Sequence, residues 1–273
     1  MQRGFQCFVR RRVMCLPQPC SLMIYIQPQS VQSLYVEPRF DGQNIGRATG
    51  FIAMSQGGPI LITNRHVVTG RHQHTGECLS KNAAVPNQLA IFHNKKGLIG
   101  QWVERVEQLY DGHDNKLWHE HPTLGERADF VAIKLTNTEN VEFVKCSLGV
   151  GDQKIRIQVT DKVSVVGFPF GIRTDGGFAI WATGSIASEP DIDHDNLPTF
   201  LIDCRSREGQ SGSPVVAHRS GSEVVWLENG SMIANGMPAT RFLGIYCGRV
   251  NKESDLGIVW KVTALKELVE SIR

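Results

Sequence analysis

Three residues far apart in the sequence have the side chains that nucleophilic catalysis by a serine requires. Ser211 lies in a polar, glycine-rich turn at 207–214. His66 follows an apolar run typical of a buried strand, and Asp129 opens a second apolar run. Glycines beside a serine let backbone N–H groups approach a bound carbonyl oxygen, because glycine has no Cβ to block them. Such a turn can supply a nucleophile and an oxyanion hole together.

Each of these residues also has an ordinary structural interpretation. The turn around Ser211 could be a hairpin loop rich in Gly and Ser, His66 a core histidine, and Asp129 a turn residue at the start of a strand. The order of the three residues along the chain favours the catalytic interpretation. Histidine, aspartate and serine follow one another as in chymotrypsin-like enzymes, whereas lipases and esterases of the α/β-hydrolase class have the order Ser, Asp, His. Spacings of 63 (129 − 66) and 82 (211 − 129) residues leave room for two small β-barrels.

Four segments resemble signature segments of the trypsin-like (chymotrypsin-fold) serine peptidases, nearer to the bacterial glutamyl-endopeptidase and HtrA-like branches than to the digestive enzymes. They are the serine turn GQSGSP (209–214), the histidine segment TNRHVV (63–68), the aspartate with its apolar strand (129–135), and the turn VGFPFG (166–171). The resemblance covers roughly residues 46–262, and a motif stays a hypothesis until geometry supports it.

The resemblance implies an all-β fold of two packed antiparallel six-stranded β-barrels with a short C-terminal helix. Apolar residues at helical spacing within 263–273 also predict that helix. The expected division of the chain is an N-terminal extension without order (1–33), a first barrel with His66 and Asp129 (34–135), a connection (136–158), and a second barrel with Ser211 and the helix (159–273).

The resemblance also implies a mechanism. Ser211 attacks a peptide carbonyl, His66 takes its proton, and Asp129 fixes the histidine tautomer. The N–H groups of Gly209 and Ser211 form the oxyanion hole, and no cofactor or metal is expected. The alternative function is a binding module that keeps the chymotrypsin fold without catalysis. The presence of all three residues favours the endopeptidase.

The substrate pocket is expected between strand-like segments 242–248 and 256–262, which resemble the walls of the family's specificity pocket. The candidate pocket residues are Arg205, Cys247, Gly248, Arg249 and Gly257. Arg205 stands six residues before Ser211, where the resemblance places the pocket floor. A buried arginine there, assisted by Arg249, would favour an acidic P1 residue. In the alternative, Arg205 points into water.

Gln210 stands where the digestive enzymes have an aspartate that pairs with a new N-terminus after cleavage. A glutamine cannot form that ion pair, so we expect no activation of the trypsin type.

The composition of the chain indicates which classes of partner to expect. The chain has 273 residues with 29 Lys and Arg against 27 Asp and Glu, and this balance argues against a nucleic-acid or membrane-surface role. The expected partner is a polypeptide substrate. Seven cysteines are an odd number and include no CxxC pair, which favours reduced thiols and a cytoplasmic location. The apolar stretch at 22–26 is too short to span a bilayer.

Overall fold

The computed structural model describes residues 25–273 except 81, 153 and 252. Its first sheet contains nine strands, and hydrogen bonds join seven of them in the order β6-β5-β1-β3-β4-β8-β7, with β2 paired to β1 and β9 to β5. The strands are β1 (Ser33–Phe40), β2 (Gln43–Asn44), β3 (Ala48–Ser55), β4 (Gly58–Thr63), β5 (Gln88–Lys95), β6 (Leu98–Gln108), β7 (Trp118–His119), β8 (Val131–Lys134) and β9 (Val141–Glu142).

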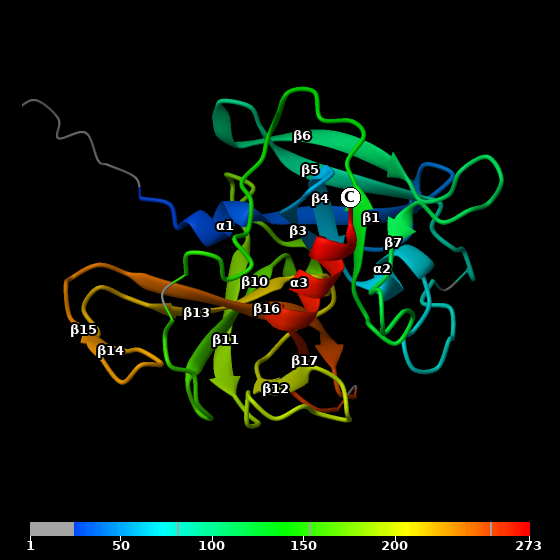
Figure 1. Cartoon of the computed structure of the whole chain (residues 1–273). Helices are drawn as coiled ribbons and strands as arrows, with labels where there is room; N and C mark the ends of the chain where they lie inside the picture. Colours follow the sequence, from blue (N-terminus) through cyan, green and yellow to red (C-terminus); the bar gives the residue numbers. More distant parts are fainter. Residues whose placement is uncertain (1–24, 81, 153, 252) are drawn as a thin grey trace, which may run out of the picture.

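The second sheet closes into a six-stranded barrel in the order β10-β11-β12-β17-β16-β13. Its strands are β10 (Lys162–Gly167), β11 (Ile180–Ile186), β12 (Thr199–Asp203), β13 (Pro214–Arg219), β16 (Ala239–Arg249) and β17 (Leu256–Lys261). A separate hairpin, β14 (Val225–Trp226) and β15 (Met232–Ile233), projects from this half (Figure 1). The helical segments are α1 (Pro28–Gln32), α2 (Arg65–Thr69), η1 (Pro169–Gly171) and α3 (Val262–Ser271).

The continuous apolar runs of the sequence are strands that are buried on both faces. In β4, Leu61 belongs to the core inside the first sheet, whereas Ile60 and Ile62 belong to the core between the two sheets. Successive side chains of a strand point to opposite faces, so a strand between two cores needs apolar residues at every position. The predicted strand before His66 therefore lies where the two halves meet.

Helix α3 packs against the core between the sheets (Figure 1). Its buried residues Ala264, Leu265, Leu268 and Val269 have the spacing of one helix face. In the same core, the rings of Phe130 and Trp260 join the two halves with centroids 5.3 Å apart. The predicted C-terminal helix is confirmed.

The predicted all-β, chymotrypsin-like fold class is confirmed, with two differences in detail. The first sheet has nine strands, and its hydrogen-bonded path is not the expected closed ring of six. The expected N-terminal extension is ordered at its end, because α1 and the start of β1 occupy residues 28–33. Ser33 Oγ donates to Val166 O at 2.7 Å, and Trp181 Nε1 donates to Ser30 Oγ at 2.8 Å, so this segment is attached to the second barrel. The rest of the expected extension, residues 1–24, lies outside the described residues.

Among the described residues, no helix is long and apolar enough to cross a membrane. Four of the seven cysteines lie in the described part of the chain, Cys78, Cys146, Cys204 and Cys247, and all four are free thiols.

Candidate active site

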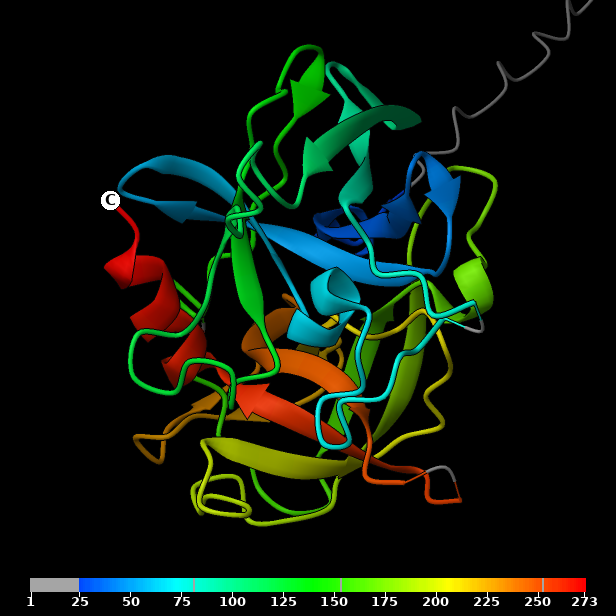
Figure 2. The ribbon, with the colours of Figure 1, turned by 90° about the vertical axis from the view of Figure 1, so that its right-hand side faces the viewer.

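His66 and Asp129 form a hydrogen-bonded pair at the junction of the two halves. His66 lies on α2, directly after β4, and this helix occupies the centre of the view in Figure 2. Its Nδ1 is 2.7 Å from Asp129 Oδ2, and its backbone N–H donates to Asp129 Oδ1 at 3.0 Å. A carboxylate only accepts hydrogen bonds, so Nδ1 carries a proton, and in the neutral ring the lone pair is on Nε2. The structure thus gives His66 the tautomer of a general base.

A buried asparagine holds the two segments in this relation. The Asn64 side chain is fully buried, and its Nδ2 donates to the backbone oxygen of Asp129 at 2.6 Å. Asp129 itself is 4% exposed and precedes β8, which pairs with β4. The strand pairing sets the distance between the two segments, and Asn64 fixes their ends.

Ser211 lies in the turn between β12 and β13, and two glycines give this turn its shape. Gly209 has a φ of +95° and Gly212 a φ of +86°, values that disfavour any residue with a Cβ. A Cβ on Gly209 would overlap the oxygen of Phe168, and one on Gly212 would overlap the oxygen of Thr49. The glycines predicted from the motif are therefore required both by conformation and by space.

The carbonyl groups of residues 207–211 are all held by hydrogen bonds, and this orients two backbone N–H groups. Phe170 N donates to Glu208 O at 2.6 Å, and Ser213 N donates to Gln210 O at 3.0 Å. In a trans peptide the C=O and the following N–H point in opposite directions. The N–H groups of Gly209 and Ser211 therefore point away from these donors, and neither has an acceptor within the described residues. Two adjacent free N–H groups are what an oxyanion hole needs.

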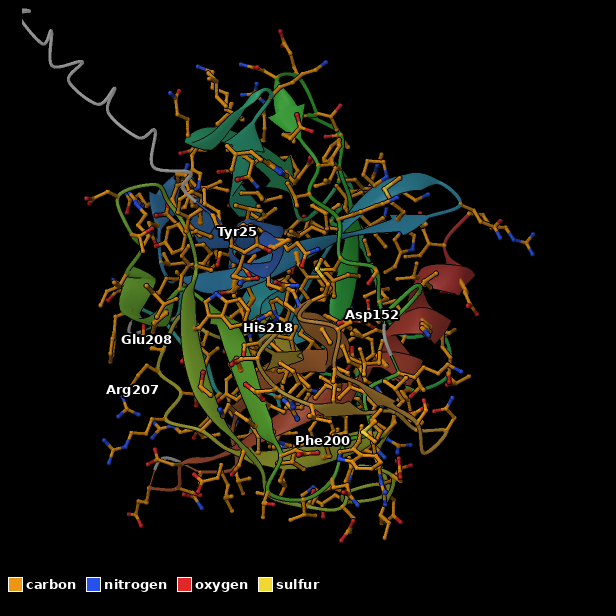
Figure 3. The ribbon with its side chains drawn as sticks, turned by 90° about the vertical axis from the view of Figure 1, so that its left-hand side faces the viewer. Tyr25, Asp152, Phe200, Arg207, Glu208 and His218 are labelled. Carbon is orange, nitrogen blue, oxygen red and sulfur yellow. The ribbon has the colours of Figure 1, made fainter. Side chains whose placement is uncertain are left out.

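The first sheet supplies two further contacts that hold this turn. Thr49 of β3 donates from its backbone N to Ser211 O at 2.8 Å and from its Oγ1 to Gly209 O at 2.8 Å. Figure 3 shows Glu208 at the edge of the molecule beside η1, whose Phe170 oxygen accepts a hydrogen bond from Arg47 Nη1 at 2.7 Å. Nothing in the sequence near Thr49 indicates contact with a turn 160 residues away.

The turn also stabilises itself through Gln210. This side chain is fully buried, and its Oε1 accepts a hydrogen bond from Arg207 N at 2.7 Å. The neutral side-chain amide of Gln210 thus joins two residues of the turn by a hydrogen bond within the turn itself.

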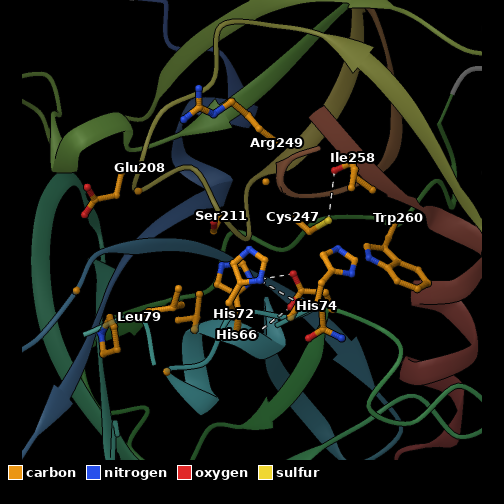
Figure 4. Close-up of a pocket in the computed structure, with 18 of the residues that line it drawn as sticks. His66, His72, His74, Leu79, Glu208, Ser211, Cys247, Arg249, Ile258 and Trp260 are labelled. Atoms are coloured by element: carbon orange, nitrogen blue, oxygen red, sulfur yellow. Dashed lines mark hydrogen bonds and ion pairs between the residues drawn. The ribbon is translucent and has the colours of Figure 1, made fainter. Parts of the chain in front are cut away.

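His66, Asp129, Gly209 and Ser211 line one cavity of about 410 Å³ (Figure 4). Its wall also includes imidazoles of the loop after α2, His72 and His74. No hydrogen bond joins Ser211 Oγ to the His66 ring among the described residues. Nucleophile–base contacts in empty sites are often longer than in complexes with substrate.

The predicted pocket residues divide into two groups. Cys247, Gly248 and Arg249 line the cavity. Burial, and secondarily the charge of Asp129, raises the pKa of the Cys247 thiol well above its usual value, so this sulfur stays protonated and does not compete with Ser211. Gly257 lies away from the cavity, against the ring of Tyr246.

Arg205 also lies outside the cavity. Its side chain is 84% exposed, and its Nε is 3.9 Å from Asp255 Oδ2 at the surface. At the surface the guanidinium stays hydrated, whereas burial at a pocket floor would have required an oppositely charged partner. The interpretation in which Arg205 points into water therefore describes the structure, and the one in which it forms the pocket floor does not.

Comparison with known proteins identifies the family. The family model of the trypsin-like peptidase domain matches residues 48–225, well over half of the chain. The chain belongs to the trypsin-like serine peptidases. This peptidase has no match among curated proteins. Its fold is similar to that of a serine endoprotease from Yersinia pestis, with a TM-score of 0.50 at 14% identity, over 89% of this chain and 65% of that one. This peptidase therefore spans less than two thirds of the length of that endoprotease.

Two structures of the Rv3671c protease from M. tuberculosis are also similar to this peptidase. The active form matches at 16% identity and a TM-score of 0.45 over 98% of this chain and 93% of that one. The inactive form matches at 17% identity and a TM-score of 0.43, over 88% of each chain. Trypsin-like peptidases act on polypeptides, so the polypeptide partner expected from the sequence is consistent with this family.

Proposed function

We propose that this peptidase is an endopeptidase that cleaves peptide bonds through Ser211, His66 and Asp129 and an acyl-enzyme. The observation that carries the proposal is the hydrogen bond of 2.7 Å between His66 Nδ1 and Asp129 Oδ2 in the cavity that Ser211 also lines. That bond leaves Nε2 as the only basic atom of the ring.

In the first half-reaction, Ser211 Oγ forms a bond to the substrate carbonyl carbon while its proton passes to His66 Nε2. The carbonyl electron pair moves onto oxygen, where the N–H groups of Gly209 and Ser211 stabilise it. The C–N bond then breaks, and the leaving amine takes the proton from His66. Asp129 stabilises the imidazolium meanwhile.

In the second half-reaction, a water molecule repeats these steps on the ester. His66 removes a proton from the water, the second tetrahedral intermediate forms, and its collapse returns the proton to Ser211 Oγ. The products are a free carboxylate and a regenerated serine. One oxyanion donor of this kind is worth about 10²–10³ in rate.

The substrate's acyl side is placed beside Cys247, Gly248 and Arg249, because these residues of β16 line the cavity next to Ser211. Arg205 is not part of this proposal, because its exposed side chain does not reach the cavity. An acidic P1 preference that depends on Arg205 is therefore not proposed.

The test is labelling by a fluorophosphonate, which reacts with activated serines, in parallel with hydrolysis of a protein substrate such as casein. We expect the wild type to be labelled and to cleave, and Ser211→Ala and His66→Ala to do neither. Ser222→Ala changes an exposed serine outside the cavity and serves as the matched control that keeps the label. Equal labelling of the wild type and Ser211→Ala would refute the assignment. A folded wild type that neither reacts nor cleaves would favour the binding module.

A further inference from the structure

The ring of Tyr246 fills the space between β17 and the segment that leads to the serine turn. Tyr246 is 2% exposed and Ser206 is 1% exposed, and their hydroxyl groups form a short hydrogen bond. Ser206 directly follows Arg205, the residue expected at the pocket floor. The tyrosine hydroxyl therefore reaches the segment, at residues 205–206, in which the family resemblance placed the floor of the pocket.

The opposite wall is shaped to accept the ring. A Cβ built on Gly257 of β17 would lie 2.5 Å from Tyr246 Cε2 and 3.4 Å from Cζ. Contacts below 3.0 Å force one partner to move, so only glycine at this position leaves the ring where it is. Instead of opening a pocket, the glycine makes room for an aromatic side chain of the protein itself.

The backbone of Tyr246 fixes the ring relative to the nucleophile. Its oxygen accepts a hydrogen bond from Gly212 N at 2.9 Å, and its N–H donates to Ser213 O at 2.9 Å. These residues directly follow Ser211, so movement of Tyr246 would disturb the serine turn. The ring is also part of the core inside the second barrel, together with residues such as Phe200 and Ile202.

The extent of the cavity agrees with a filled pocket. Cys247 and Gly248 of β16 and Ile258 of β17 line the cavity. Ser206, Tyr246 and Gly257, which contact one another behind these residues through the Tyr246 ring, do not line it. A P1 side chain that entered between these strands would meet the Tyr246 ring after a short distance.

Building on the proposed function, we propose that Tyr246 closes the P1 pocket and restricts this peptidase to substrates with a small P1 residue, such as alanine, glycine or serine. A side chain longer than valine cannot enter without displacing a ring held by a core and a hydrogen bond. One methylene group that does not fit such a pocket costs on the order of 10–200-fold in kcat/KM. We therefore expect leucine, phenylalanine, glutamate and arginine at P1 to be cleaved roughly 100-fold or more slowly than alanine.

The experiment measures kcat/KM for peptides that differ only at P1, with the wild type, Tyr246→Ala, Tyr246→Val and Tyr246→Phe. Tyr246→Phe keeps the ring and loses only the hydroxyl, so it should keep the preference for alanine. The two truncations should raise the ratio of leucine to alanine cleavage by roughly 10-fold or more. Retained fluorophosphonate labelling identifies truncated variants with an intact site.

A wild type that cleaves after leucine, phenylalanine, glutamate or arginine as fast as after alanine would overturn the proposal without any variant. An unchanged leucine-to-alanine ratio in a truncated variant that is still labelled would also overturn it. Failure of the proposed function has a different signature, because the wild type would then neither be labelled nor cleave any peptide of the series.

Discussion

Thr49→Val tests whether the first sheet holds the serine turn. Threonine and valine have nearly the same shape, so the change removes one hydroxyl and opens no cavity. That hydroxyl donates to Gly209 O at 2.8 Å and accepts from Phe168 N at 3.2 Å. Thr49 and Phe168 are fully buried, so water cannot replace either bond.

The expected loss of stability follows from two buried backbone groups, Gly209 O and Phe168 N, that lose their hydrogen-bond partner. A buried donor or acceptor left unsatisfied costs about 1–3 kcal/mol, so the variant should lose roughly 2–6 kcal/mol of unfolding free energy. Gly209 O would no longer be tethered, and the N–H groups on either side of it would become less well ordered. We expect kcat/KM to fall about 10–100-fold, less than the 10²–10³ for complete loss of an oxyanion donor.

The assay is urea unfolding, followed by peptide hydrolysis under conditions in which all variants are folded. Thr49→Ser is the matched control, because it keeps the hydroxyl and loses a methyl group, a change worth about 1 kcal/mol. Thr49→Val as stable and as active as Thr49→Ser would refute the role of the hydroxyl. Lower stability with unchanged kcat/KM would limit Thr49 to a structural role.

Three further changes test other parts of the site and fold. In thermal unfolding, Gly212→Ala should lose at least about 3 kcal/mol of unfolding free energy, and it should lose nearly all activity, because its Cβ would overlap Thr49 O. The control Gly230→Ala, at a glycine with a φ of +81° and no atom near its Cβ, should lose only about 1–2 kcal/mol in the same measurement. Asp129→Asn should lower kcat by about 10⁴ in a hydrolysis assay with an unchanged circular dichroism spectrum, because the amide favours the wrong His66 tautomer; a loss below 10-fold would contradict the proposed role. The buried His93 should make stability depend on pH, since burial, followed by the charge of Arg105, lowers its pKa to about 4. The unfolded chain takes up this proton near pH 6.5, so the stabilisation is complete above pH 6.5 and falls by about 3 kcal/mol between pH 6.5 and 4. His93→Leu should flatten this part of a urea-unfolding profile, and an equally steep profile in the variant would rule out His93 as its cause.

The candidate residues of the site could be identified in the sequence because its parts are local. The tight turn around Ser211 requires glycines at fixed positions, and His66 and Asp129 each lie beside a strand that is buried on both faces. Each segment has a signature within about eight residues. The order of the three then selects one arrangement among the known serine hydrolases. Only the fold could show that they face one cavity, since β4 and β8 bring His66 and Asp129 together by pairing.

The positions of the Arg205 and Tyr246 side chains were decided by tertiary structure. A sequence shows Arg205 six residues before Ser211, but whether its charge is buried depends on the path of the chain, and hydration favours the surface. The direction of Tyr246 depends on a shift in register between Tyr246 and Gly248, where β16 pairs with β17. Such a bulge breaks the alternation of side chains from which a strand's inner face is predicted. The sequence by itself determined which residues are candidates for the chemistry, whereas the three-dimensional packing determined that Arg205 is exposed and that the Tyr246 ring is buried, because contacts between distant strands have no local signature.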